Sequence, residues 1–379
     1  MSTTELITAP LRKLDNELYD LVKGFNILDS VSPVNYRQEK AAFFESSFSR
    51  SPAFVYATQK VDSFCLKRSL FNLPVDKLAD PELSQLYSDV IESYVDKIDQ
   101  YKSIGTADFL YESFRYYGEP SEKDIRNANF ILHLPDPDPG RDEMLCADEI
   151  VSRLERFAQT EGYEYQIRLE DSMIANALVS GTTVKVNRSA SVSETEVDAL
   201  AHHELGVHLV TTLNARRQPL KILSMGCPVN TMTQEGLAIL SEYLAGCMTL
   251  PRLKVLALRV LAVESMVEEN DFKKTFLFLK EQHNVADEQA FTITARVYRG
   301  GGFTKDYLYL QGLHQMLNAY ETRPDFNNLL SGKVSIEHLS VITGLIDKGY
   351  LFKPELISPA IAHPQENDAI QKFITHAIK

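Results

Sequence analysis

The sequence predicts a mostly helical α+β fold with a small mixed sheet. Apolar residues recur at helical spacing over about residues 1–125 and again from about residue 234 nearly to the end. Between these regions, short apolar runs are separated by turn-forming residues, which is typical of strands. We therefore expect a helical N-terminal region over residues 1–125 and a second region over residues 126–379, packed together as one unit.

Three helices are predicted in the N-terminal region. The first lies within residues 14–25, which have helical apolar spacing. The second begins after Asp80, because Asp80 can cap a helix and Pro81 suits its first position. The third covers residues 109–116 and ends at the glycine and proline within residues 118–121.

The sheet is expected from short segments in the middle of the chain. Residues 130–134 form an apolar run that predicts a strand, and the alternating Asp and Pro of residues 135–140 predict an exposed loop. A helix is predicted over residues 147–160. Residues 165–169 predict a further strand, and residues 176–186 predict a β-hairpin.

Composition limits the classes of partner and the cellular compartment. A net charge of −13 at pH 7 argues against nucleic acid or an anionic membrane as the main partner, because both select basic surfaces. The chain has no 18-residue apolar run and no basic and apolar leader of the secretory type. Its four cysteines are scattered, so we expect a reduced, cytoplasmic protein.

The most informative segment runs from His203 to His208, with Glu204 directly after the first histidine. A capping box over residues 193–196 predicts the start of the helix that carries it. Neutral imidazoles bind zinc, and a neighbouring glutamate can accept a proton from the attacking water. Because the histidines are five residues apart, a regular α-helix would place them roughly 140° apart. A π-type turn would bring them onto one face, with Gly206 at its strained point.

A catalytic zinc site needs a third protein ligand and an open position. Glu235, within the Gln-Glu-Gly-Leu-Ala segment of residues 234–238, is the candidate. A capping box over residues 231–234 would place Glu235 in the first turn of a new helix. Glu242, two turns further along the same face, could accept a hydrogen bond from a ligand histidine. The alternatives are a charge that stabilises a helix N-terminus for Glu235 and a solvated carboxylate for Glu242.

Candidate substrate contacts lie in residues 296–309, where basic and tyrosine residues surround three glycines that would let the backbone approach a ligand. Arg299 or Lys305 could bind a terminal carboxylate. Tyr298 or Tyr307 could donate a hydrogen bond to a developing oxyanion. A flexible turn with solvated charges is the alternative interpretation of this segment.

Two further features could contact a substrate. An extended peptide can add to an exposed sheet edge, and residues 182–187 are the expected edge. Lys333, directly after Gly332, could provide another basic contact. A surface lysine after a helix-ending glycine has the same pattern and stays open as an alternative.

The segments 203–208, 234–238, 296–306 and 332–333 also carry a resemblance to known families. They resemble the bacterial QEGLA-motif family, which is named for modulating flavohaemoglobin expression. They are also similar to the eukaryotic microtubule-associated tyrosine carboxypeptidases, zinc enzymes that remove the C-terminal tyrosine of α-tubulin. The bacterial resemblance does not imply that α-tubulin is the substrate of this chain.

The resemblance implies a gluzincin-like metallopeptidase that binds one Zn²⁺. It implies that His203, His208 and Glu235 are the metal ligands and that Glu204 is the catalytic base. The same five-residue spacing occurs in dipeptidyl-peptidase III, which supports the wider helical turn. The resemblance assigns no role to the basic and tyrosine residues of the segment 296–309.

Three functions follow from these residues. The first is a zinc carboxypeptidase that removes a C-terminal residue, with a possible aromatic preference, from a peptide or protein. The second is a zinc endopeptidase or dipeptidyl-peptidase, and the third is a non-catalytic regulatory protein. Glu204 argues against the third, because a protein that only binds a partner has no need of a base.

Overall fold

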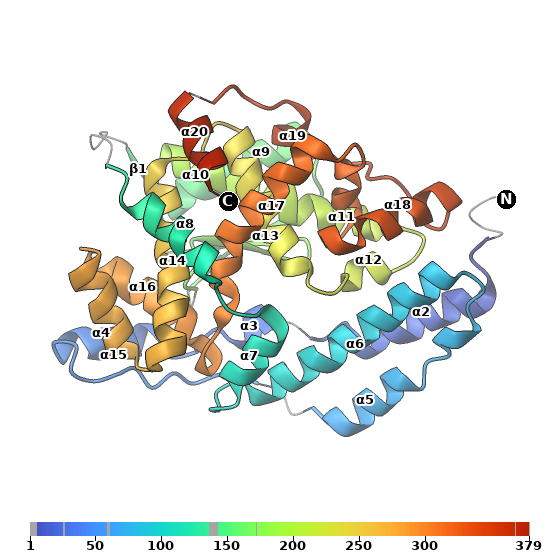
Figure 1. The fold of residues 1–379 in the computed structure, drawn as a ribbon, viewed down its shortest axis with the longest axis horizontal. Helices are drawn as coiled ribbons and strands as arrows, with labels where there is room; N and C mark the ends of the chain where they lie inside the picture. Colours follow the sequence, from blue (N-terminus) through green and yellow to red (C-terminus); the bar gives the residue numbers. More distant parts are fainter. Residues whose placement is uncertain are drawn as a thin grey trace.

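The computed structural model describes residues 6–25, 27–58, 61–135, 143–171, 173–367 and 369–378, and it is mostly helical with two small sheets (Figure 1). This confirms the predicted α+β class. The predicted loop of Asp and Pro falls mostly on residues 136–142, which lie outside the described residues. None of the helices in these ranges combines the length and the apolar character that a bilayer crossing needs.

The N-terminal helices lie along one side of the molecule and are drawn in blue in Figure 1. The long helix α6 (Pro81–Ser103) begins where predicted, because the Asp80 carboxylate accepts hydrogen bonds from the amides of Glu82 and Leu83 at 3.0 and 3.1 Å. The other two predicted helices are α2 and α7. The remaining bounds are α2 (Ala9–Val22), α3 (Ile27–Ser30), α4 (Tyr36–Glu45), α5 (Ser63–Phe71), η1 (Val75–Lys77) and α7 (Phe109–Tyr117).

One predicted strand is wrong. Residues 130–134 lie at the end of α8 (Glu122–Leu132) and just beyond it, not in a sheet. Ser121 and Asp124 form a capping box that starts this helix, and Ile131 is fully buried on its inner face. A short apolar run does not distinguish a strand from one buried face of a helix.

The larger sheet has three strands in the order β2–β4–β3. β2 (Gln166–Glu170) runs parallel to β4 (Thr183–Asn187), and β3 (Ala177–Ser180) pairs with β4 as an antiparallel hairpin. The mixed sheet and the hairpin are therefore confirmed. The prediction that residues 182–187 form the exposed edge is wrong, because β4 is the central strand. A separate antiparallel pair joins β1 (Met144–Cys146) to β5 (Ser191–Ser193).

The rest of the chain is helical. The predicted helix over residues 147–160 is α9 (Ala147–Glu161), and α10 (Glu194–Leu200) begins at the predicted capping box. α13 and α17 cross at the centre of Figure 1. The remaining bounds are η2 (Ala201–Leu209), α11 (Val210–Arg217), α12 (Ile222–Met225), α13 (Asn230–Leu244), α14 (Leu250–Glu269), α15 (Phe272–Leu277), η3 (Phe278–Gln282), α16 (Asp287–Tyr298), η4 (Arg299–Gly301), η5 (Thr304–Tyr307), α17 (Leu308–Thr322), η6 (Phe326–Ser331), η7 (Ile336–His338), α18 (Leu339–Lys348), α19 (Pro359–Ala362) and α20 (Ala369–Ala377).

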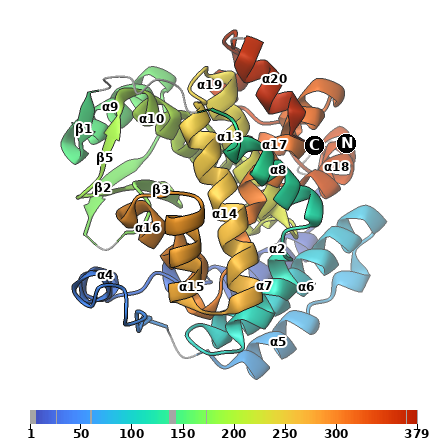
Figure 2. The same cartoon turned by 60° about the vertical axis from the view of Figure 1, so that its left-hand side comes forward.

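Two hydrophobic clusters hold these elements together. The larger cluster includes side chains from α2, α6, α13 and α17, so the N-terminal helices share a core with the later ones. The smaller cluster lies between the three-stranded sheet, α9 and η2, where Val184 and Val186 share a core with Leu205 and Leu209. The strands gather beside α9 and α10 in Figure 2, and β3 contacts η2. The sheet therefore lies directly beside the segment that carries His203 and His208, as the sequence predicts.

The backbones of α13 and α17 touch at a pair of glycines. A Cβ atom at Gly236 would lie 2.4 Å from the carbonyl oxygen of Gly312, and one at Gly312 would lie 2.5 Å from the carbonyl oxygen of Met232. Neither distance leaves room for a side chain, because protein interiors are close-packed. Gly236 is therefore required by this crossing, which also sets the position of the preceding residue, Glu235.

Replacing Gly236 with alanine should lower the free energy of unfolding by about 1–3 kcal/mol, as overpacked cores do. In a helix without this close contact, the same change would raise the free energy of unfolding by about 1 kcal/mol. A decrease would therefore show that the two helices are too close for a side chain at this position. Urea unfolding of both proteins measures the difference. Gly24→Ala is the control, because no atom of the described residues outside its chain neighbours lies within 4 Å of a Cβ atom there. A Gly236→Ala protein as stable as the wild type would contradict the tight crossing.

Candidate metal centre

The two histidines lie on a π-helical segment. η2 has nine residues with π-type hydrogen bonding and continues α10 into α11. The predicted widening of the helix is confirmed, but the predicted strain at Gly206 is wrong, because its φ angle is not positive. A Cβ atom at Gly206 would instead lie 3.3 Å from Ser358 Oγ and 3.6 Å from Ser241 Oγ. The missing side chain lets η2 pack closely against α13 and the residue before α19.

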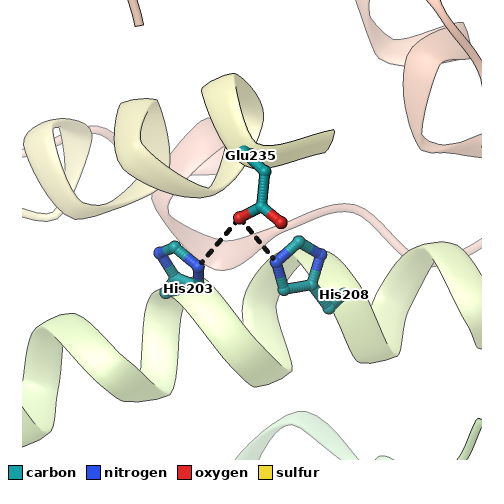
Figure 3. A group of neighbouring side chains, drawn as sticks. All are labelled: His203, His208 and Glu235. Atoms are coloured by element: carbon teal, nitrogen blue, oxygen red, sulfur yellow. Dashed lines mark ion pairs between the residues drawn. The ribbon is translucent and has the colours of Figure 1, made fainter. Parts of the chain in front are cut away.

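The π-helical turn brings His203 and His208 to the same face, where Glu235 points toward both of them from α13 (Figure 3). The Oε2 atom of Glu235 lies 3.7 Å from His203 Nε2 and 3.6 Å from His208 Nε2. One potential ligand atom from each of the three residues lies within 4.8 Å of the others. These three residues could hold a metal ion, and we call them the metal-ligand cluster.

Glu235 reaches this position differently from the sequence prediction. α13 begins at Asn230 without a side-chain cap, so the predicted capping box over residues 231–234 is wrong and Glu235 is not in the first turn. The side-chain amide of Gln234 donates instead to the carbonyl oxygens of Gly332 and Val334, at 3.5 and 3.3 Å. This contact ties the start of α13 to the segment that follows η6.

Glu242 holds His203 from the side opposite the metal-ligand cluster. The Nδ1 atom of His203 and Glu242 Oε1 are 2.8 Å apart, which is the contact predicted for Glu242. Arg252 donates two hydrogen bonds to the same carboxylate, at 2.8 and 2.9 Å. Burial opposes ionisation of Glu242, but the Arg252 guanidinium and the bond from His203 lower its pKa to about 2. This pair fixes the ring of His203 with Nε2 turned toward Glu235.

Burial and neighbouring charges shift the pKa values of two residues in the metal-ligand cluster. Burial disfavours the charged form of His203, but the nearby Glu235 carboxylate and the hydrogen bond to Glu242 raise its pKa to about 10. Burial also opposes ionisation of Glu235, yet the Lys305 ammonium and the two histidines hold its pKa well below the usual range. Within the described part of the chain, the buried Oε2 atom of Glu235 has no conventional hydrogen-bond partner, although it faces both imidazoles.

Glu204 lies next to the metal-ligand cluster and is buried. Its Oε2 atom accepts a hydrogen bond of 2.9 Å from the amide of Val179 in β3, and its Oε1 atom lies 4.0 Å from His203 Nε2. β3 therefore fixes the orientation of this carboxylate. The edge strand that faces the metal-ligand cluster is β3, in place of the predicted residues 182–187.

A cavity of about 300 Å³ contains the metal-ligand cluster and Glu204. Its walls come from α3, β3, the start of α13 and the segment 296–309. Lys333 also lines this cavity, so it is not a surface lysine, and burial lowers its pKa to about 8. The other polar side chains that line the cavity include Asn230, Thr231, Gln234, Arg296, Arg299 and Lys305.

Three buried basic side chains from the segment 296–309 line one side of the cavity. Asp306 pairs with Arg296 at 2.5 Å and lies 3.7 Å from Arg299 Nη2. Lys305 donates to Glu235 Oε1 at 2.7 Å, so its charge is committed to the metal-ligand cluster. Among the described residues, the buried Nε atom of Arg299 has no hydrogen-bond partner. Of the two candidates for a terminal carboxylate, Arg299 therefore has the greater unused capacity.

A sequence model of one family, the microtubule-associated tyrosine carboxypeptidases, matches residues 41–379. The chain belongs to this family. It is 25% identical over 355 residues to a rat microtubule-associated tyrosine carboxypeptidase 1, a match that covers 87% of this chain and 66% of the rat protein. Identity to the mouse protein of the same name is 25% over 344 residues, covering 85% of this chain and 63% of the relative.

A mouse putative tyrosine carboxypeptidase, MATCAP2, is 24% identical over 331 residues, covering 83% of this chain and 55% of the relative. The chain therefore spans about two thirds or less of the length of these relatives. The resemblance to the bacterial QEGLA-motif family stays a prediction, since these matches are to the microtubule-associated family.

Two residues that were predicted to contact a substrate, Tyr298 and Tyr307, do not line the cavity. The Tyr298 hydroxyl pairs with Thr275 at 3.1 Å, and the Tyr307 hydroxyl donates to the carbonyl oxygen of Tyr117 at 2.6 Å. Neither tyrosine lines the cavity, whereas Tyr117 and Tyr309 do. The position of Tyr117, on α7 and far away in sequence, carried no signal that sequence reasoning could use.

The three glycines of the family segment 296–306 serve packing, so the prediction that they approach a ligand is wrong. All three have positive φ angles. A Cβ atom at Gly300 would lie 2.5 Å from the ring of Phe109, and one at Gly301 would lie 2.5 Å from the carbonyl oxygen of Thr106. The turn is therefore shaped by the start of α7, which lies against it.

Residues that precede the family match also reach the cavity. The match begins at residue 41, but Leu28, Asp29 and Ser32, on and just after α3, line the cavity. The Lys185 side chain of β4 pairs with Asp29 at 3.3 Å, which ties α3 to the sheet. Because α3 has only four residues, its sequence carried no periodic signal that would have predicted this position.

Proposed function

We propose that this chain is a zinc-dependent carboxypeptidase that removes the C-terminal residue of a peptide or protein in the cytoplasm. The observation that carries the proposal is the placement of Glu204 beside the cluster of His203, His208 and Glu235, within one cavity. This combination of two imidazoles, one carboxylate ligand and one free carboxylate suits metal-assisted hydrolysis. Nucleic acids and membranes are not expected partners.

The donor set fits Zn²⁺. Ligand atoms about 2.0–2.1 Å from a tetrahedral zinc lie roughly 3.4 Å apart, close to the 3.6 and 3.7 Å separations between Glu235 and the two histidines. The buried Oε2 atom of Glu235, which lacks a conventional hydrogen-bond partner, is the atom that such a metal would use. Zinc held there would acidify a water molecule and polarise a peptide carbonyl. A ligand helix, a downstream glutamate and an adjacent sheet also suit a gluzincin-like domain.

Glu204 acts as the base. Its carboxylate accepts a proton from the water that attacks the peptide carbonyl and then gives this proton to the leaving amine. The hydrogen bond from the Val179 amide holds the carboxylate in place during both transfers. In an antiparallel pair, a residue whose amide points away from its partner strand also turns its carbonyl outward. The edge of β3 therefore offers the Val179 carbonyl to an extended peptide.

Arg299 favours a carboxypeptidase over an endopeptidase. Arg296 and Arg299 both lie at the single carboxylate of Asp306 on one side of the cavity, and the Nε atom of Arg299 has no hydrogen-bond partner among the described residues. A terminal carboxylate would supply the missing acceptor and the missing charge, since a buried cation without a counter-charge is costly. The relatives are named tyrosine carboxypeptidases, so we propose a C-terminal tyrosine or other aromatic residue as the one removed.

The test uses defined peptides that end in tyrosine, each made with a free acid and with an amidated C-terminus. The purified protein is incubated with them, with and without a chelator, and the products are read by mass. We expect loss of one residue from the free acid, little reaction of the amide, and no reaction after chelation. Internal cleavage would show an endopeptidase instead. If none of the peptides is cleaved, the result would support a protein without catalytic activity.

Zinc binding should release a proton near neutral pH. The pKa of His203 is raised to about 10 in the metal-free protein, so the ring is protonated at neutral pH and the metal must displace that proton. Zinc affinity should therefore rise about tenfold per pH unit from pH 7 to 9 and level off above pH 10. Calorimetry in buffers of different ionisation enthalpy measures the released proton. Glu242→Gln removes one cause of the raised pKa and should reduce the release, whereas a buffer-independent heat would contradict the protonated state.

A further inference from the structure

Lys333 is held rigidly against the helix that carries the proposed ligands. Its ammonium group donates to the carbonyl oxygen of His208 at 3.2 Å and to Thr211 Oγ1 at 2.9 Å. Its backbone is also fixed, because its amide donates to the carbonyl oxygen of Leu223 and its own carbonyl accepts from the amide of Cys227, both at 2.9 Å. The side chain lines the cavity that contains the metal-ligand cluster.

Lys333 has no acidic partner within the described parts of the chain. Both acceptors of its hydrogen bonds are neutral, and no ion pair joins it to a carboxylate there. Lys305, by contrast, bonds Glu235 directly. An ammonium group has three N–H donors, so one donor of Lys333 is left for the cavity. The carboxylates of Glu204 and Glu235 line the same cavity but form no direct ion pair with Lys333 there, so its remaining donor can bond a negative group that arrives from outside.

The position of Lys333 separates its role from that of Arg299. Lys333 bonds the carbonyl oxygen of His208, a proposed ligand, and lines the cavity together with Glu235 and Glu204, the proposed third ligand and base. Arg299 instead lies beside the pair of Arg296 and Asp306, with its Nη2 atom 3.7 Å from the Asp306 carboxylate. Lys333 therefore faces the reacting centre, where a carbonyl oxygen becomes negative, whereas Arg299 faces the side proposed for the terminal carboxylate.

We propose that Lys333 donates a hydrogen bond to the oxygen of the scissile carbonyl and stabilises its negative charge in the transition state. As water adds to the carbonyl carbon, the π electron pair moves onto this oxygen, and it returns when the bond to the leaving nitrogen breaks. Lys333 keeps its proton throughout, because Glu204 carries the proton that is transferred. This inference rests on the proposed carboxypeptidase function and extends it by a catalytic residue.

The test compares Lys333→Met with Arg299→Gln in the full-length, zinc-loaded protein. Removal of an oxyanion donor costs about 10²–10³-fold in kcat, so we expect that loss for Lys333→Met with a nearly unchanged KM. Its preference for a free acid over an amidated peptide should equal that of the wild type. Arg299→Gln should lose that preference. If Lys333→Met loses the preference instead, Lys333 binds the terminal carboxylate and the proposal is wrong.

A binding measurement does not depend on turnover. A phosphinic peptide, which mimics the tetrahedral transition state, should bind Lys333→Met about 10²-fold less tightly by calorimetry, while the cleaved product should bind as before. Equal weakening of both ligands would overturn the proposal. Lys333→Gln is the second variant if Lys333→Met does not fold, and the exposed Lys123→Met is the charge-matched control.

Zinc content and thermal unfolding of each variant separate this inference from the proposed function. Lys333→Met with full zinc, wild-type stability and low kcat supports the inference, and the same protein with wild-type kcat refutes it. If the wild type itself binds no zinc and cleaves no peptide, the proposed function has failed. That failure is visible before any variant is compared.

Discussion

The Glu204→Gln protein should bind zinc and fold like the wild type but hydrolyse its peptide substrate at least about 10³-fold more slowly. Glutamine keeps the shape of the side chain, and its oxygen can still accept the hydrogen bond from the Val179 amide. It cannot accept a proton from the attacking water at neutral pH. The loss should therefore appear in kcat, with the affinity for peptide nearly unchanged.

Zinc content by elemental analysis and single-turnover assays measure the two parts of this prediction. Glu355→Gln is the control for removing one carboxylate, because this side chain is 72% exposed and pairs with Arg217 on the surface. It should keep full activity. Near-normal hydrolysis by the Glu204→Gln protein would mean that another group acts as the base, and the proposed mechanism would be wrong.

The ligand helix could be predicted because its information is local. Two imidazoles that share a metal must lie on one face, and a spacing of five residues satisfies this only on a wider helix. The structure has that helix over Ala201–Leu209. The reason for Gly206 was not local, since its missing side chain makes room for Ser241 and Ser358, which come from other elements. The pattern therefore predicted the shape of the helix but not the neighbours that require it.

The order of the strands could not be predicted from the hairpin alone. The hairpin of β3 and β4 is encoded by its own turn, but β2 adds to β4 on the other side. That parallel pairing joins β2 to a strand that follows it only after β3, so it depends on packing and not on adjacent residues. β3 was consequently left as the edge that meets Glu204, in place of the predicted residues 182–187.

The basic and tyrosine residues of the segment 296–309 show the same limit. Each of these side chains is of a type that can bind a substrate, but tertiary contacts decide which ones face the cavity. Tyr307 turns its hydroxyl to the end of α7, whereas Arg299 lines the cavity. Arg252, which holds Glu242 and through it His203, had no signal beyond a basic residue near a helix start. The sequence thus predicted which three residues would lie together more fully than the residues that position them.

Replacing Glu235 with alanine should remove zinc from the protein. Loss of an outer-shell partner alone reduces metal affinity about 10–100-fold, so loss of a ligand should reduce it by more than about 100-fold. The variant also leaves the Lys305 ammonium buried without the carboxylate that it bonds at 2.7 Å. Breaking a buried pair in this way costs about 3–5 kcal/mol, so the metal-free variant should also unfold at lower denaturant concentration than the metal-free wild type.

Two further variants separate the two effects of this substitution. Lys305→Met together with Glu235→Ala removes the unpaired charge and should recover stability without recovering zinc. His208→Ala should lose zinc but keep the bond between Glu235 and Lys305, so its metal-free form should remain close to wild-type stability. Zinc content and urea unfolding measure both quantities. Full zinc occupancy in Glu235→Ala would exclude Glu235 as a ligand, and its close approach to both histidines would then belong to a hydrogen-bonded network that binds no metal.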